Sequence, residues 1–125
     1  MNINEPTIVD EIRTIFNRYE VALVGDDLTM MAELFFQGSE IVRFGINDCE
    51  RGSEELAHWR KSQSPHRPGR ELSDVTVTTY GDTVAIVTAP FSYPDRPLLG
   101  RQSQTWLRID QSWRIVHAHV SEIDA

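Results

Sequence analysis

The spacing of apolar residues changes near Gly38, from a helical period before it to alternation after it. The segment 5–24 carries apolar side chains on one helical face, at Ile8, Ile12, Ile15, Phe16, Tyr19 and Leu23. A shorter helix follows Gly25 and carries Leu28, Met31, Leu34 and Phe35. A chain that begins with paired helices and continues as strands is typical of an α+β fold.

The remainder of the sequence predicts one further helix and a meander of strands. A first strand covers 40–44, a helix follows from Ser53 to Ser62, and the proline-rich segment 64–69 is a loop. Alternating residues then predict strands over 75–80, 84–91, 100–109 and 112–123. A strongly twisted antiparallel sheet curls over helices. We therefore expect a single domain over 1–125, shaped as a cone, with a pocket between the first helix and the sheet.

Composition excludes several classes of protein. The net charge of -7 disfavours a nucleic-acid partner, and no basic stripe offsets it. No apolar stretch approaches the ~20 residues that span a bilayer, and the first residues lack the pattern of a signal peptide. A single cysteine, Cys49, forms no internal disulfide. These features predict a cytoplasmic protein without a membrane partner.

The last hairpin carries the most information about a site. With Asp110 and Gln111 as a two-residue turn, the pairs are expected to be Arg108–Trp113, Trp106–Ile115, Gln104–His117 and Gln102–His119. One face of the hairpin would then hold an apolar floor and, above it, the polar residues Gln102, Gln104, His117, His119 and Ser121. The other face would carry Val116, Ala118 and Val120. The alternative is a solvated sheet end.

Two further residues stand out as candidates. Arg43 interrupts an apolar strand, so its guanidinium requires an anion from a ligand or from the protein itself; the alternative is a surface arginine or an internal salt bridge. Tyr19 lies on the apolar face of the first helix, where a buried phenol needs a partner and can act as an acid. Its alternative is a core tyrosine bonded to a backbone carbonyl.

Other residues give weaker signals. We expect Trp59 and Trp106 to line the substrate site, unless they serve as core or interface anchors with Trp113. His117 and His119 stand two apart without a third ligand at metal-binding spacing, so we expect no metal. No phosphate loop, dinucleotide fingerprint or serine nucleophile motif occurs.

The sequence resembles the AtzH/HpxZ-like family over nearly its whole length. The resemblance rests on Arg18-Tyr19-Glu20 through Leu23-Val24-Gly25, on Arg43-Phe44-Gly45, and on the hairpin from Gly100 through Trp106 to Ser121. It implies a cone-shaped, SnoaL-like fold, a homodimer through the sheet, and no cofactor. It also implies that Tyr19 and Arg43 are catalytic.

The activity implied by the resemblance is that of a decarboxylating amidohydrolase of nitrogen catabolism, acting on 1,3-dicarboxyurea or a related ureido or carbamate acid. As a hypothesis, Arg43 would hold a carboxylate while Tyr19 passes a proton to the leaving nitrogen. The polar groups of Gln102, Gln104, His119 and Ser121 would bind the ureido atoms. Two alternatives stay open: a non-catalytic small-anion binder of an amidohydrolase pathway, and a structural domain associating through the outer sheet face.

Overall fold

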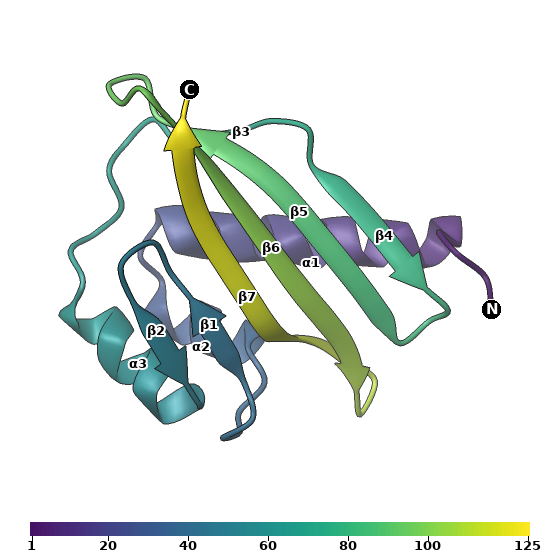
Figure 1. Ribbon diagram of the computed structural model, residues 1–125. Coiled ribbons are helices and arrows are strands. Elements are labelled where there is room, and N and C mark those ends of the chain that lie inside the picture. Colours follow the sequence, from purple (N-terminus) through teal and green to yellow (C-terminus); the bar gives the residue numbers. More distant parts are fainter.

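A curved sheet carries three helices on one face, and the computed structural model describes all residues, 1–125 (Figure 1). The helices are α1 (Pro6–Val24), α2 (Leu28–Leu34) and α3 (Ser53–Ser62). The strands are β1 (Val42–Phe44), β2 (Cys49–Arg51), β3 (Glu71–Leu72), β4 (Thr76–Tyr80), β5 (Val84–Ser92), β6 (Leu98–Ile109) and β7 (Ser112–Asp124). The expected α+β architecture is confirmed.

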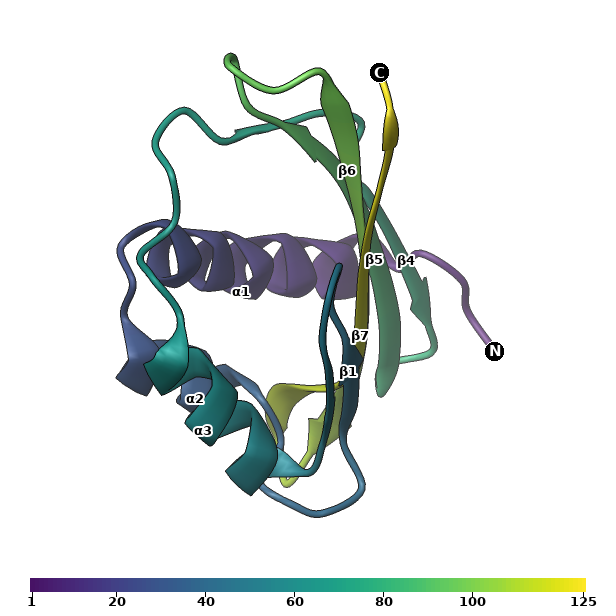
Figure 2. The same cartoon turned by 60° about the vertical axis from the view of Figure 1, so that its left-hand side comes forward.

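The strand order is β2-β1-β7-β6-β5-β3, and β4 also pairs with β5. The pairing of β1 with β7 is parallel, so the sheet is mixed and not wholly antiparallel as expected. Figure 2 shows α1 lying across the concave side of the long strands, with α2 and α3 at one end of it. None of the three helices combines the length and the apolar character needed to cross a membrane.

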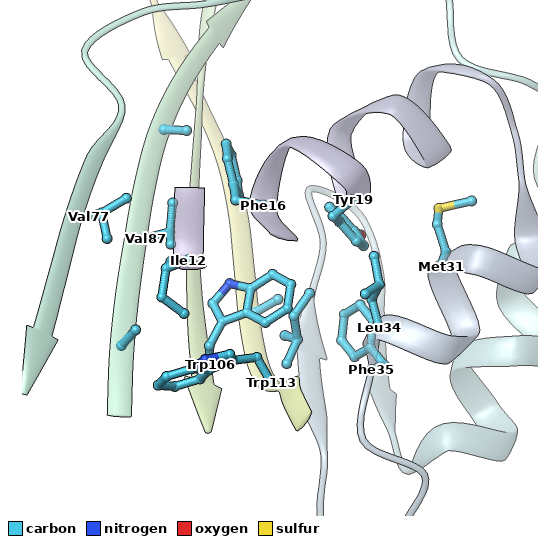
Figure 3. Close-up of a cluster of buried hydrophobic side chains, with 14 of the residues drawn as sticks. Ile12, Phe16, Tyr19, Met31, Leu34, Phe35, Val77, Val87, Trp106 and Trp113 are labelled. Carbon is cyan, nitrogen blue, oxygen red and sulfur yellow. The ribbon is translucent and has the colours of Figure 1, made fainter. Parts of the chain in front are cut away.

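The core lies between α1, α2 and the concave face of the sheet. Ile12 and Phe16 of α1 point toward Trp106 and Val87 of the sheet, while Tyr19 points toward Phe35 beyond α2 (Figure 3). The Tyr19 and Phe35 ring centroids are 6.0 Å apart. Burial of this apolar face fixes α1 on the sheet, and it places the hydroxyl end of Tyr19 beside the third helix.

A β-bulge in β7 divides the last hairpin into two registers. Both turn residues, Asp110 and Gln111, adopt positive φ, as a type I′ turn requires, and the expected pairs hold as far as Trp106–Ile115. The next pair is Thr105 with His117, so Val116 is an extra residue on β7. The register expected beyond this point is therefore wrong by one residue.

The bulge exchanges the faces that were expected for the end of β7. Ala118 and Val120 face the helices, opposite Gln104 and Gln102, whereas His119 and Ser121 pair with Ser103 and Arg101 on the outer face. On that outer face His117 and His119 both contact the ring of Phe44 edge-on. The prediction that Ala118 and Val120 belong to an association surface on the outer sheet face is thus wrong. A homodimer through the sheet stays a prediction.

Candidate functional site

A cavity of about 490 Å³ lies between the helices and the concave face of the sheet. Its walls come from all three helices, the β1–β2 hairpin, the segment 63–70, the loop between β5 and β6, and residues of β5, β6 and β7. Twenty-six residues line it, and only ten of them are hydrophobic. A cavity of this size with convergent polar groups is typical of a small-molecule site.

The hydroxyl group of Tyr19 is held by an arginine that was not among the predicted site residues. Arg60 of α3 donates from Nη2 to the Tyr19 hydroxyl oxygen at 2.9 Å, and from Nη1 to the sulfur of Met31 at 3.1 Å. Its guanidinium also lies over the ring of Phe35. Since the Tyr19 oxygen accepts from Arg60, its own O–H remains free to donate to a ligand.

Arg43 forms a second corner of the cavity with two carboxylates of the β1–β2 hairpin. Its Nη1 donates to Asp48 at 2.7 Å and to Glu50 at 3.1 Å. The guanidinium also stacks on the indole of Trp59, 4.5 Å from the ring centroid. The internal salt bridge weighed for Arg43 is therefore present, and the residue still lines the cavity.

Glu50 is the titratable group of this corner. Burial, then the neighbouring Asp48 carboxylate, raises the pKa of Glu50 to about 7, although the Arg43 guanidinium acts in the opposite direction. Near neutral pH the corner therefore takes up or releases a proton at Glu50. A carboxylic acid held neutral by burial can also donate a hydrogen bond.

We expect the shifted pKa of Glu50 to make folding stability depend on pH. The ordinary pKa is 4.5 and the folded value is about 7, so between them the folded state keeps a proton that the unfolded state has lost. The contribution of Glu50 to the free energy of unfolding, on the order of 3 kcal/mol, is complete below pH 4.5 and is lost as pH rises through 7. Urea unfolding of wild type and Glu50→Gln from pH 4.5 to 8 should show the difference between them changing by this amount. Parallel curves would contradict it.

Two glutamines of β6 place one free hydrogen-bond acceptor and one free donor in the cavity. Gln102 donates its amide N–H to Glu20 at 3.1 Å, which leaves its carbonyl oxygen without a protein partner. Gln104 accepts from the indole N–H of Trp106 at 3.0 Å, which leaves its amide N–H₂ free. One glutamine can thus accept from a ligand N–H while the other donates to a ligand carbonyl oxygen.

A buried ion pair supports Gln102 through Glu20. Arg70 donates to Glu20 at 2.9 Å and stacks on Phe91 at 4.1 Å. Burial opposes the charge of Arg70, but the hydrogen bond and charge of Glu20 raise its pKa on balance. Partial burial, and then the Arg70 charge, lower the pKa of the nearby His66, so this imidazole is neutral near pH 7.

Five arginines line the cavity, and four of them have carboxylate partners. The pairs are Arg43 with Asp48 and Glu50, Arg67 with Asp95, Arg70 with Glu20, and Arg96 with Glu122. Arg60 forms no ion pair, and its Nε atom is buried without a hydrogen-bond partner. The cavity therefore contains one guanidinium whose charge the protein does not balance.

The structure brings together five of the eight residues predicted for the site. Tyr19, Arg43, Trp59, Gln102 and Gln104 all line the cavity. His119 and Ser121 do not, because the bulge turns them to the outer face. Trp106 is fully buried in the core and does not line the cavity; its link to the site is the hydrogen bond that it donates to Gln104.

Arg60 and Glu20 were not predicted as site residues, although helical spacing contains a signal for both. Arg60 follows Leu56 by four positions, and Glu20 follows Phe16 by four, so each charged residue lies on a buried helix face. The acidic pair of the β1–β2 hairpin was also missed, because it lies in a turn and a two-strand ribbon without a periodic signal. No three His, Cys, Asp or Glu side chains gather in a group that could hold a metal ion.

Curved-sheet architecture with helices on the concave face defines the class of this protein. The chain superposes with a TM-score of 0.76 on an NTF2-like protein of unknown function from Pseudomonas putida KT2440, with 19% identity, over 92% of this chain and 86% of the other. At that identity the likeness concerns the fold alone. The fold is the NTF2-like, SnoaL-like cone.

The sequence matches the AtzH-like family over residues 1–125, and the chain belongs to this family. A cystatin-like fold protein from Burkholderia xenovorans LB400 is 41% identical, with a TM-score of 0.97 over 100% of this chain and 98% of the other. A DUF3225-family protein of unknown function from Pectobacterium atrosepticum SCRI1043 is 34% identical, with a TM-score of 0.94 over 98% and 95%. No match is found among curated protein sequences.

Proposed function

We propose that this protein is a cofactor-free enzyme that removes carbon dioxide from a small ureido dicarboxylate such as 1,3-dicarboxyurea. The observation that supports this most is the free O–H of Tyr19, which lines one cavity with two arginines and two complementary glutamine amides. Membership of the AtzH-like family supports the substrate class. The family resemblance that selects Tyr19 and Arg43 agrees with their shared position in the cavity.

The ureido group fits the free atoms of the two glutamines. The N–H₂ of Gln104 would donate to the central carbonyl oxygen, and the carbonyl oxygen of Gln102 would accept from a ureido N–H. Arg43 would position one carboxylate through those of its N–H groups that do not bind Asp48 and Glu50. The indole of Trp59, stacked on Arg43, fixes the plane of that guanidinium.

The chemical step is a protonation coupled to loss of carbon dioxide. The bond between a ureido nitrogen and its carboxylate carbon breaks, and its electron pair stays on the nitrogen. The carboxylate leaves as carbon dioxide, while the nitrogen takes the proton of Tyr19. Arg60, whose Nη2 already donates to the Tyr19 oxygen, stabilises the phenolate until water returns the proton. The organic product is a ureido monocarboxylate.

The direct test follows the carboxyl carbon. Wild-type protein is mixed with 1,3-dicarboxyurea labelled with ¹³C at both carboxylates, and the reaction is followed by ¹³C NMR against an enzyme-free control. We expect labelled carbon dioxide and bicarbonate to form with one equivalent of ureido monocarboxylate, faster than in the control. Ligand-induced chemical-shift changes without product above the control rate would instead identify a non-catalytic binder.

A further inference from the structure

The charge of Arg60 is unusual for a buried side chain. The residue is 8% exposed, so its guanidinium has lost most of its hydration. A buried cation without an anion is costly, and proteins usually supply a carboxylate partner. Here the neighbours are a neutral phenol, a thioether sulfur and the face of Phe35, none of which carries a negative charge.

The other arginines of the cavity emphasise this difference. Arg43, whose side chain is 13% exposed, shares its Nη1 between two carboxylates, so its corner carries no net positive charge. The carboxylates Glu20 and Glu122 neutralise Arg70 and Arg96. An anion that enters the cavity therefore finds one unbalanced positive charge, at Arg60.

We propose that Arg60 is the anion-selecting residue of the cavity and holds a carboxylate of the ligand beside the Tyr19 hydroxyl. Each terminal nitrogen of Arg60 uses one N–H for Tyr19 or Met31 and keeps a second. Two N–H groups of one guanidinium can donate to the two oxygens of a carboxylate. Arg43, whose charge is already balanced, then contributes position and not charge selection.

This inference rests on the proposed function for the identity of the site, and it adds the charge of the ligand and the residue that selects it. It also explains how a chain of net charge -7 attracts an anion. The long-range field of the protein repels the ligand, whereas the local field at the helix α3 wall of the cavity attracts it.

A binding experiment separates charge selection from catalysis. Glutarate has two carboxylates at the ends of a chain as long as that of dicarboxyurea, and glutaramide is its neutral diamide. Their dissociation constants are measured by titration calorimetry for wild type, Arg60→Met and Arg60→Lys. Lys61→Met is the matched control, because it removes a charge from an exposed position of the same helix that does not line the cavity.

We expect wild type to bind glutarate at least tenfold more tightly than glutaramide, since a charge-assisted hydrogen bond is worth that factor or more. Arg60→Met should lose this preference, Arg60→Lys should keep most of it, and Lys61→Met should keep all of it. Retained preference in Arg60→Met, or no preference in wild type, would overturn the inference. A wild type that selects glutarate through Arg60 but forms no product from dicarboxyurea would refute only the proposed reaction.

Discussion

Tyr19→Phe is expected to lower the turnover of 1,3-dicarboxyurea by ~10²–10⁴-fold, the usual contribution of a positioned acid. The substitution removes the only phenolic O–H that lines the cavity within reach of Arg60, while its ring keeps the contact with Phe35. Binding of the substrate should change much less than turnover, because the carboxylates and ureido atoms retain their partners. Initial rates from ¹³C NMR at saturating substrate give the measurement.

The matched control for Tyr19→Phe is Tyr80→Phe, which makes the same chemical change on β4, outside the cavity. Tyr19→Phe leaves one N–H of Arg60 without its acceptor, so we expect a loss of about 1–2 kcal/mol in the free energy of unfolding. Native domains have a free energy of unfolding of roughly 5–15 kcal/mol, so we expect the variant to stay mostly folded at 25 °C. Turnover of Tyr19→Phe within twofold of wild type would remove Tyr19 from the mechanism.

Arg43→Met is expected to destabilise the fold by roughly 3 kcal/mol at pH 8, the lower end of the range for breaking a buried ion pair. The substitution leaves Asp48 and Glu50 as neighbouring carboxylates without a cation. It also removes the guanidinium that stacks on Trp59. The effect should shrink at pH 5, where Glu50 is protonated in the folded state because its pKa is about 7.

A double variant tests whether the two carboxylates cause this loss. Adding Glu50→Gln to Arg43→Met removes one of the unbalanced charges and should recover about 1–2 kcal/mol at pH 8. Urea unfolding at pH 5 and pH 8 supplies all the required values. Equal destabilisation by Arg43→Met at both pH values, without recovery in the double variant, would show that Arg43 stabilises the fold through packing on Trp59 alone.

Periodicity was sufficient to predict the three helices, the longer strands and part of the site, but not the short strands β2 and β3. The helical spacing from Ile8 to Leu23 places Tyr19 on the sheet-facing side of α1, and the structure confirms this. The expected two-residue turn at Asp110 and Gln111 is also present. Gln102 and Gln104 face the helices because β6 is regular along its inner face.

Alternation could not predict the end of β7. A register counted from the turn holds only while both strands contribute one residue to each pair. The extra residue Val116 breaks this condition, and the sequence around it gives no local signal of a bulge. Valine is an ordinary strand residue. Glycine and proline often mark an irregularity in a strand, but neither occurs at this position. His119 and Ser121 were misplaced for this reason. Trp106 was misplaced for another, because an inward-facing aromatic residue can belong either to a closed core or to a cavity wall.

The partners of the charged side chains in the site could not be predicted, because they are set by tertiary structure. Whether Arg43 meets a ligand or a protein carboxylate is decided by the β1–β2 hairpin, which brings Glu50 directly opposite it in the ribbon. Arg60 is similar, because only the packing of α3 beside Tyr19 and Met31 shows that its charge stays unbalanced. Sequence spacing identifies such residues as inward-facing and leaves their partners undetermined.

The extra residue Val116 gives the end of β7 two possible linings for the cavity. Without the bulge, the same residues in a regular ladder with β6 would pair Val116 with Thr105, and this register would turn His117, His119 and Ser121 inward and Ala118 and Val120 outward. A small apolar wall would become an imidazole-bearing one without a single substitution. A β-bulge that forms or disappears in a strand can therefore change which side chains line a cavity in this fold, a route that position-by-position comparison of side chains overlooks.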